Sequence, residues 1–337
     1  MTTESTRQTV TVSDVAAHAG VSRATVSYAL TQPSRLSDEM LARVQASIAE
    51  LGYVRNDAAR RLRVGRSQAL GLVVANSRNP FFAELASGVE TEAARHGLFI
   101  LLANADDNPE RERQYLRFFE SQQVNGVLIA PVGAVPEELV ELRKKGTPFV
   151  LLGKPEGDTI YPSVSGDGRS GGRLATEHLI SQGRRRLLFV GGPHPQVVDR
   201  RDGATDAVDA AASGITLETI TVPLQTARAG EEIAEQLLRR GELPDGIFAG
   251  NDLLALGLMH RLIAAGVSIP QTLSLVGYDD IEFAELAIVP LTSVRHAGDK
   301  MGAAAVLKLL DADSSGQPEE AEFAPQLMVR QTSLRLT

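Results

Sequence analysis

Arginine is the residue whose placement in this sequence points most directly to chemistry. Residues 1–66 hold nine arginines and no lysine against six acidic residues, a formal charge of +3 in a chain of 337 residues whose total is −8. The rest of the chain therefore carries −11. A guanidinium is a planar fork that fits phosphates and the edge of guanine. The pattern indicates a polyanion-binding segment joined to an acidic body, although a solvated helical surface would give the same charge.

A second set of polar and aromatic side chains follows the first two apolar runs of the body. The segment NPFF at 79–82 comes after one run, and Asn104 and Asp106 come after the next. Ligands of open parallel sheets bind beyond the carboxyl ends of the strands, so Phe81, Phe82, Asn104 and Asp106 are candidate ligand contacts. The two phenylalanines would offer flat faces to the C–H side of a sugar or to a planar ring. Packing in the core is the alternative for both.

Catalytic chemistry finds little support in the motifs. The absence of cysteine removes disulfides, thiolate nucleophiles and Cys-ligated metals, and it favours a reducing compartment. There is no G-x-S-x-G, P-loop or H-E-x-x-H motif, and the six histidines lack metal-ligand spacing. GDGRSG at 166–171 spells a dinucleotide fingerprint but lacks the acidic residue expected about 20 residues later. We therefore predict a protein that is not an enzyme and holds no cofactor and no metal.

Three short helices are predicted ahead of the body. Ser13 marks the start of the first, Ser22 caps a second over residues 23–30, and Ser37 begins a third that ends near residue 51. Gly20 lies where a tight turn needs a left-handed residue. Helices in this order resemble a helix-turn-helix module, whose second helix enters the major groove of DNA.

After residue 67 apolar runs alternate with helical patterns. Runs such as LGLVVA and GVLIAP are continuous, as in parallel strands covered on both faces, and none approaches the roughly 18 residues of a membrane helix. Strands are predicted at 69–75, 99–103, 126–130, 148–152, 186–191, 220–222, 246–249 and 273–276. Helices are predicted at 81–96, 110–123, 136–145, 170–181, 200–212, 228–240, 252–265 and 297–311. About eight such units with a break near 161–165 predict two doubly wound lobes.

Two longer segments resemble the lactose-repressor (LacI/GalR) family of bacterial transcription regulators. VTVSDVAAHAGVSRATVSYAL, from residue 10, is similar to the N-terminal signature of that family. LGYVRNDAARRLRVGRSQALGLVV, from residue 51, is similar to its third-helix end, hinge and first core strand. The resemblance covers residues 10–75 nearly without gaps, and further motifs extend it to about residue 333. Thr31, where Asn is usual, and the lack of lysine in the head are departures.

The resemblance implies an all-α helix-turn-helix head and an α/β periplasmic-binding-protein-like core of two doubly wound parallel-sheet lobes. The implied domains are 1–55 for DNA binding, 56–66 for a hinge helix or linker, and 67–337 for effector binding and dimerisation. Lobe one would span about 67–162 and 293–321, and lobe two about 163–292 and 322–337. The chain would cross between the lobes near residues 162, 292 and 322.

On DNA, the resemblance implies base-edge contacts at Arg23, Ala24 and Tyr28. Arg23 would fork onto guanine and Ala24 would touch a thymine methyl, while Tyr28 has the alternative of packing on the third helix. The hydroxyls suit phosphate contacts, which position the protein without specifying sequence; these residues are Ser22, Thr25 and Ser27.

The hinge segment NDAARRL at 56–62 fits the family pattern N-x-x-A-R-x-L. Seven residues are too few for a stable isolated helix, so we expect it to become helical only on DNA and beside a partner hinge. The resemblance implies that Leu62 wedges into the minor groove, with Asn56 and Arg60 as further DNA contacts. A basic linker with Leu62 docked on the core is the alternative.

For the effector, the resemblance implies contacts in three motifs and at the start of the second lobe. Arg200 begins R-x-x-G, Asn251 and Asp252 form an N-D pair, Asp279 lies in GYDD, and Asp167 begins the second lobe. Carboxylates flanking one arginine suit a polyol, because they accept from hydroxyls while the fork orients the ligand. Capping a helix is the alternative for Asp252.

Together these features predict a cytoplasmic transcription regulator, in our interpretation a repressor. It would bind a near-palindromic operator in double-stranded DNA as a homodimer, under the control of a small-molecule effector, first of all a sugar or sugar derivative. The start of the chain lacks the apolar segment of a signal peptide. The sequence also lacks the leucine-heptad tail that would predict a tetramer. A solute-binding receptor of a sugar transporter has the same kind of core and is the alternative function.

Overall fold

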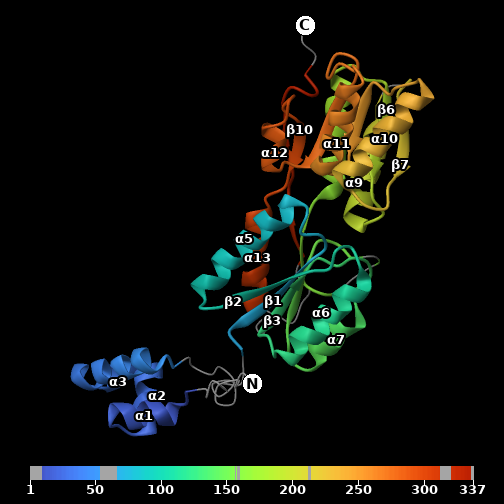
Figure 1. Ribbon diagram of the computed structural model, residues 1–337. Coiled ribbons are helices and arrows are strands. Elements are labelled where there is room, and N and C mark those ends of the chain that lie inside the picture. Colours follow the sequence, from blue (N-terminus) through green and yellow to red (C-terminus); the bar gives the residue numbers. More distant parts are fainter. Residues whose placement is uncertain are drawn as a thin grey trace, which may run out of the picture. The chain divides into compact units, whose positions relative to one another are not determined.

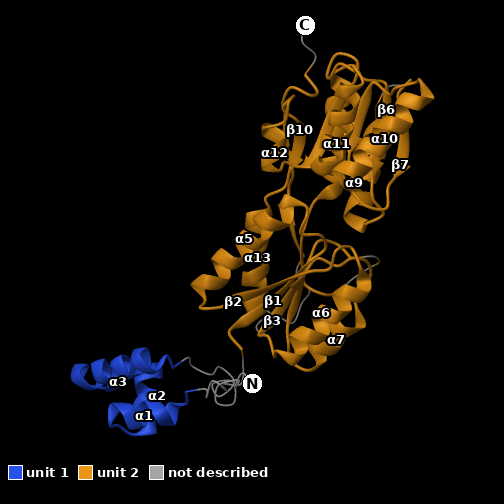
Figure 2. Ribbon diagram, in the orientation of Figure 1, with its two compact units in different colours: residues 1–65 blue, residues 66–337 orange. Residues whose placement is uncertain are grey.

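The computed structural model describes residues 10–53, 67–155, 157, 160–211, 214–311 and 320–334. The chain separates into two compact units, residues 1–65 and 66–337 (Figure 2). The hinge prediction, with Asn56, Arg60 and Leu62, lies outside the described residues.

The first unit is a set of three helices around a small apolar core. The helices are α1 (Val12–Ala19), α2 (Arg23–Thr31) and α3 (Asp38–Leu51), with a 3-10 turn η1 (Pro33–Arg35) after α2. Each helix contributes one fully buried valine to the core, Val15, Val26 and Val44. Gly20 follows α1 with a φ of 63°, the left-handed conformation that the turn into α2 requires. The predicted helix-turn-helix order is confirmed.

One detail of this unit was predicted wrongly. Thr11, not Ser13, caps α1, because the Thr11 hydroxyl accepts from the Asp14 amide at 3.4 Å. The Asp14 carboxylate accepts in return from the Thr11 amide at 2.7 Å, which completes a capping box and lowers the pKa of Asp14. Ser22 and Ser37 cap α2 and α3 as predicted. The hydroxyl of Ser13 is therefore not needed to begin its helix.

The second unit contains two six-stranded sheets, and the first of them is parallel throughout. Its strand order is β11-β5-β4-β3-β1-β2, and Figure 1 labels β2, β1 and β3 next to one another. Its strands are β1 (Ala69–Val74), β2 (Phe99–Asn104), β3 (Gly126–Ile129), β4 (Phe149–Leu152), β5 (Ser163–Gly166) and β11 (Glu320–Phe323). The covering helices are α5 (Pro80–Arg95) and α13 (Gly298–Asp311) on one face, and α6 (Pro109–Ser121) and α7 (Glu137–Lys144) on the other.

The second sheet has the order β12-β10-β9-β8-β6-β7, with β12 antiparallel to β10. Its strands are β6 (Arg186–Gly191), β7 (Thr216–Thr221), β8 (Gly246–Ala249), β9 (Ser274–Asp279), β10 (Thr292–Arg295) and β12 (Gln326–Met328). The covering helices are α10 (Ala227–Arg240) and α11 (Asp252–Ala264) on one face, and α8 (Gly168–Ser181) and α9 (Pro195–Asp209) on the other; the short α12 (Glu282–Glu285) follows β9.

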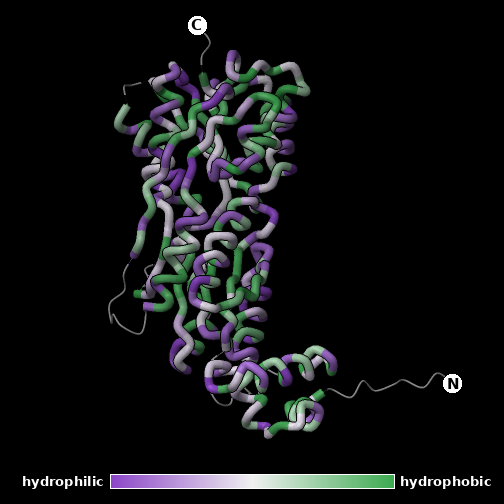
Figure 3. The backbone as a smooth tube through the Cα atoms, turned by 90° about the vertical axis from the view of Figure 1, so that its left-hand side faces the viewer, coloured by the Kyte–Doolittle hydropathy of each residue, from purple (hydrophilic) through white to green (hydrophobic). Residues whose placement is uncertain are grey.

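The central strands of both sheets are buried on both faces. Every residue of β3, β4 and β8 is buried, and the tube in Figure 3 changes between hydrophobic and hydrophilic colours every few residues. That is the burial expected of parallel strands with helices on either side, so the predicted two-lobed α/β architecture is confirmed. None of the described helices is long and apolar enough to cross a membrane.

Four strands next to the lobe connections lie outside the predicted strand ranges. β5, β10, β11 and β12 read SVSG, TSVR, EAEF and QLM, which are short and lack the continuous apolar runs of the predicted strands. Ladder pairing places β5 beside β4 and β11 beside β5, so both lie in the first sheet. The chain therefore leaves the first lobe after Gly166, returns to it after Arg295 and leaves it again after Phe323, a few residues beyond the predicted crossings.

Candidate functional site

α2 carries the predicted DNA contacts on its exposed side. Arg23 and Ala24 are exposed and Tyr28 is 40% exposed. Ser22 and Thr25 are joined, since the Thr25 amide donates to the Ser22 hydroxyl at 3.1 Å and the two hydroxyl oxygens lie 2.9 Å apart. Ser27 is partly buried. The exposed side thus presents a cation, a methyl group and a phenol ring, with hydroxyls at the positive end of the helix dipole, where a phosphate is favoured.

Two side chains from outside α2 contact its exposed arginine and tyrosine. The Nε of Arg23 donates to the Ser13 hydroxyl on α1 at 2.8 Å. The guanidinium of Arg35, on η1, lies 5.6 Å from the centroid of the Tyr28 ring, a cation–π contact. Tyr28 is therefore held beside η1, with its ring still exposed.

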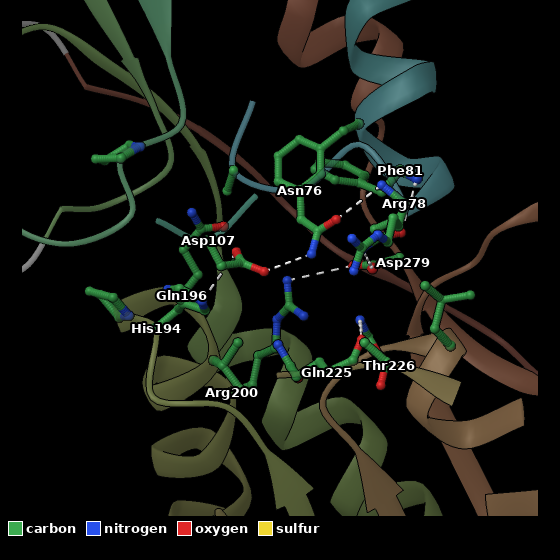
Figure 4. Close-up of a pocket in the computed structure, with 18 residues that line it drawn as sticks. Asn76, Arg78, Phe81, Asp107, His194, Gln196, Arg200, Gln225, Thr226 and Asp279 are labelled. Carbon is green, nitrogen blue, oxygen red and sulfur yellow. Dashed lines mark hydrogen bonds and ion pairs between the residues drawn. The ribbon is translucent and has the colours of Figure 1, made fainter. Parts of the chain in front are cut away.

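A cavity lies between the two lobes of the second unit (Figure 4). It encloses about 800 Å³ when its open mouth is included. The polar and aromatic residues that line it from the first lobe are Asn76, Arg78, Asn79, Phe81, Phe82 and Asp107. Those from the second lobe are His194, Gln196, Arg200, Gln225, Thr226, Asn251 and Asp279. The lining follows the carboxyl ends of the strands, as expected of an open parallel sheet.

Arg200 is the buried cation of this cavity. Its Nη1 donates to the Gly250 carbonyl and its Nη2 lies 3.6 Å from the Asp279 carboxylate. The guanidinium lies 3.5 Å from the centroid of the Tyr278 ring, and burial raises the pKa of that phenol to about 12. In Figure 4 Arg200 points from its helix into the space between the lobes. A side chain at Gly203 would meet the α8 backbone at 1.9 Å, which explains why R-x-x-G ends in glycine.

Asp279, the ion-pair partner of Arg200, also connects the two lobes. One carboxylate oxygen accepts from the Asn79 amide of the first lobe at 2.7 Å, and the other accepts from His296 Nε2 at 3.1 Å. His296 in turn stacks on Phe81, with ring centroids 4.1 Å apart and planes inclined by 7°. Asp279 has a φ of 101°, a strained conformation for a residue with a side chain, and such residues gather at functional sites.

The N-D pair divides between the cavity and the interior. Asn251 lines the cavity and caps α11, because its Oδ1 accepts from the Leu254 amide at 2.9 Å. Asp252 is fully buried and does not line the cavity. Its carboxylate accepts from the Ser293 hydroxyl at 2.6 Å and from the Ile281 amide at 2.8 Å, and burial raises its pKa well above the ordinary value. Asp252 therefore holds the segment after β9 in place.

Three further predicted contacts lie away from the cavity lining. Asn104 accepts from the amides of Ser77 and Asp106 at 3.0 and 3.2 Å, and so shapes the loops after β1 and β2. Asp106 forms ion pairs with Arg78 at 3.3 Å and Arg111 at 3.1 Å. Asp167 caps α8, accepting from the Ser170 amide at 2.8 Å. Phe81, Phe82, Arg200, Asn251 and Asp279 are the predicted contacts that the structure brings together.

The candidate contacts predicted from the sequence leave out several residues of the lining. Asp107 is the neighbour of a predicted residue, and it accepts from the Asn76 amide at 2.6 Å. His194 Nδ1 lies 3.2 Å from the Val132 carbonyl of the first lobe, and its Nε2 lies 3.5 Å from Asp107. Both residues follow strand ends, which was the available signal. Gln196, Gln225 and Thr226 lie in segments without a motif, and nothing in the sequence singled them out.

Two buried polar atoms at the cavity have no hydrogen-bond partner among the described residues. They are the Nε of Arg200, a donor, and the Oε1 of Gln225, an acceptor. Buried polar groups are almost always satisfied in folded proteins, so a group of this kind in a cavity points to a ligand. A hydroxyl group donates and accepts at once and is able to satisfy both kinds of atom.

Comparison with known proteins gives two family matches and close relatives of full length. Residues 11–56 match the family of bacterial regulatory proteins, lacI family, and residues 176–333 match a periplasmic binding protein-like domain. The ribose operon repressor of Bacillus subtilis is 33% identical over 322 residues, which are 95% of this chain and 96% of that protein.

Solved structures agree over most of the chain. A complex of the transcriptional regulator CelR with cellobiose is 29% identical and covers 96% of this chain and 99% of that one, with a TM-score of 0.71. A LacI family transcriptional regulator from Enterococcus faecium with bound ribose is 29% identical and covers 80% of this chain and 100% of that one, with a TM-score of 0.72.

Proposed function

Because this chain belongs to the lacI family of bacterial regulatory proteins, we propose that it is a repressor released or recruited by a sugar in the cavity between its lobes. The chain is a DNA-binding transcription regulator and not an enzyme. The observation that carries the effector proposal is the buried Arg200, whose Nε lacks a partner among the described residues while its other nitrogens are held by Gly250 and Asp279.

The lining favours a small ligand with several hydroxyl groups. Asp107 and Asp279 supply acceptors from opposite lobes, and Arg200 supplies a donor, its Nε, which is unpartnered among the described residues. Phe81 and Phe82 add apolar faces at the same cavity, a combination that suits the polar rim and the C–H face of a sugar ring. The names of the relatives point the same way, because two carry ribose in their description and one structure holds cellobiose. We therefore propose a monosaccharide or a close derivative as effector.

On the DNA side, α2 enters the major groove with Arg23, Ala24 and Tyr28 toward the base edges. Ser22, Thr25 and Ser27 contact phosphates in this proposal. The hinge residues Asn56, Arg60 and Leu62 bind the minor groove, where Leu62 is the wedge.

The functional unit in this proposal is a homodimer on a near-palindromic operator. Two exposed apolar surfaces are suited to pairing. One is the edge strand β2, where Phe99 is 69% and Leu102 is 56% exposed. The other surrounds α12, where Phe283, Leu286 and Ile288 are exposed. Unpaired edge strands and apolar patches of this kind invite association with a second chain.

Effector and DNA are coupled through the tilt of the lobes. Contacts that cross between them include Asn79 with Asp279 at 2.7 Å and His194 with the Val132 carbonyl at 3.2 Å. A ligand that binds one tilt better than the other shifts the population, and in a dimer the first lobes then set whether both hinges pair on DNA.

A transporter receptor would share the two-lobed core, and the two functions differ in the head. Residues 11–56 match a DNA-binding family. A receptor that only binds a solute does not need a DNA-binding segment, so this match favours the regulator. We place the protein in the cytoplasm, where its DNA is.

The test is binding of genomic DNA fragments by the purified full-length protein, with and without ribose, other monosaccharides and a nucleoside. We expect protection of a near-palindromic site, affinity that falls steeply with salt, and a change of affinity with one sugar. Leu62→Ala is expected to weaken operator binding and leave sugar binding intact, with Leu334→Ala as a control far along the chain. A protein that binds sugar but no DNA fragment would contradict the regulator assignment, and DNA binding indifferent to every sugar would contradict the effector.

A further inference from the structure

The arginine on the exposed side of α2 is not free to swing. Arg23 is the first residue of α2, and side chains on a helix lean toward its N-terminus. This direction brings its guanidinium to the first turn of α1, where Nε donates to the Ser13 hydroxyl at 2.8 Å. The contact joins α1 to α2. The two residues are ten positions apart, and the turn of the helix-turn-helix lies between them.

The hydroxyl of Ser13 has no other local task that the structure shows. A serine near the start of a helix is ordinarily its cap, but here Thr11 and Asp14 form the capping box of α1. Ser13 therefore contributes its hydroxyl to Arg23 and not to the start of its own helix. A single exposed hydrogen bond of this kind adds little to stability.

The position of the bond on the guanidinium decides what remains for DNA. Ser13 takes Nε and leaves the two terminal nitrogens, Nη1 and Nη2, at the outer end of the side chain. None of the described carboxylates forms an ion pair with Arg23. Two parallel N–H donors are the pattern that matches the O6 and N7 acceptors of guanine in the major groove.

We propose that Ser13 is a positioning residue for sequence reading, which holds Arg23 so that its terminal nitrogens face a guanine. The inference rests on the proposed function, in which Arg23 contacts a base edge. Ser13 acts through Arg23 and contributes specificity for one base pair in each half-site. It fixes the side chain before DNA arrives, so less conformational freedom is lost on binding; ordering one long side chain corresponds to roughly 2- to 12-fold in affinity.

The experiment compares full-length Ser13→Ala, Ser13→Thr, Arg23→Ala and the double variant Ser13→Ala/Arg23→Ala. Each is measured at one salt concentration on the operator selected by the wild-type protein, and on operators with each guanine replaced by adenine. Arg23→Ala identifies the base pair that Arg23 reads. The readout is the ratio of two dissociation constants, one for the operator with adenine at that base pair and one for the operator with guanine. The salt dependence of operator binding and the melting temperature of each variant are measured as well.

We expect Ser13→Ala to lower that ratio by about 2- to 12-fold and to leave the salt slope and the melting temperature unchanged. Ser13→Thr, which keeps a hydroxyl, is expected to preserve the ratio. In the Arg23→Ala background, Ser13→Ala is expected to change nothing further, because the two residues act as one unit.

Other outcomes overturn the inference in distinguishable ways. An unchanged ratio in Ser13→Ala removes the positioning role and leaves the base contact of Arg23 standing. A loss of affinity that is equal for all sequences and persists in the Arg23→Ala background shows that Ser13 contacts DNA itself. If Arg23→Ala alters no base preference, Arg23 does not contact a base edge. Ser13 then has no base contact to position, and the inference is wrong.

Discussion

The two lobes of the effector cavity use the same short motif in opposite order. In the first lobe Asp106-Asp107 follows β2, and in the second Asp279-Asp280 ends and follows β9; all four residues have a positive φ. Asp107 and Asp279 line the cavity. Their neighbours face away, with Asp106 paired to Arg78 and Arg111, and Asp280 paired to Arg295 and Arg330. In each lobe, one aspartate of the positive-φ pair thus lines the cavity, and the other forms ion pairs with two arginines.

The two pairs differ in burial. The side chains of Asp279 and Asp280 are 2% and 0% exposed, against 13% for Asp107 and 27% for Asp106. Charges removed from water interact more strongly with each other and with a ligand. The aspartates of the second lobe therefore give the cavity a desolvated wall, and those of the first lobe give it a wetter wall. We expect substitutions in the second lobe to cost more effector affinity.

The largest effect is expected from Arg200→Ala. Removing a buried, hydrogen-bonded charge leaves Asp279 and the ligand without their partner, and losses of this kind reach at least about 30-fold in affinity. Arg78→Ala is the matched change on the first-lobe wall, where the side chain is 65% exposed, and we expect no more than about a 3-fold loss. Isothermal titration with the identified sugar measures both, and effector-free operator binding shows that the variants fold. Equal losses would remove the contrast between the lobes.

A smaller effect tests which aspartate of the first lobe meets the ligand. Asp107→Asn and Asp106→Asn both keep a residue that tolerates the left-handed conformation, so neither strains the backbone. We expect Asp107→Asn to weaken sugar binding about 10-fold, through the loss of one charge-assisted hydrogen bond. Asp106→Asn is expected to leave sugar affinity within about 2-fold. If Asp106→Asn weakened sugar binding more than Asp107→Asn, the ligand contact would belong to Asp106, the residue predicted from the sequence.

The division between the lobes also marks where sequence reasoning succeeded. The second-lobe residues Arg200, Asn251 and Asp279 lie in motifs whose spacing is fixed by helix starts and strand ends, so a resemblance was enough to predict that they line one cavity. The choice between Asp106 and Asp107 depends on backbone torsions in a turn, and a one-residue difference of this kind is not visible in a pattern.

Other parts of the site depend on tertiary contacts that no local pattern encodes. Asp252 was a candidate effector contact because it belongs to the N-D pair, but its carboxylate accepts in the interior from Ser293, 41 residues later. Gln225 lines the cavity because β7 and β8 both pair with β6, which brings the segment after β7 beside Asn251. The two-lobed fold was predictable because long apolar strands and amphipathic helices repeat. The short polar strands at the crossings are specified by their neighbours in the sheets.

Glu112 offers the smallest and most specific test of the wetter first lobe. It lies buried on α6, and its carboxylate accepts from the Val132 amide at 2.9 Å. The carbonyl of the same Val132 faces His194 of the second lobe, so Glu112 supports a segment that contacts the other lobe. Burial raises the pKa of Glu112 from 4.5 to about 7, and the hydrogen bond from Val132 opposes only part of that rise.

Because the folded chain holds this proton more tightly than the unfolded chain, Glu112 favours folding fully below pH 4.5. That contribution declines as the pH rises through 7. Gln at this position keeps an acceptor for the Val132 amide and does not titrate. We expect the melting temperature of the wild type, relative to Glu112→Gln, to fall by about 2–4 °C between pH 5 and pH 8.5. Sugar affinity at pH 7 should change less than about 2-fold. Glu141→Gln, which loses a surface ion pair with Lys144, is the control. If that variant gave the same pH profile, the titration would belong to the surface of α6 and α7 and not to the buried carboxylate behind the cavity.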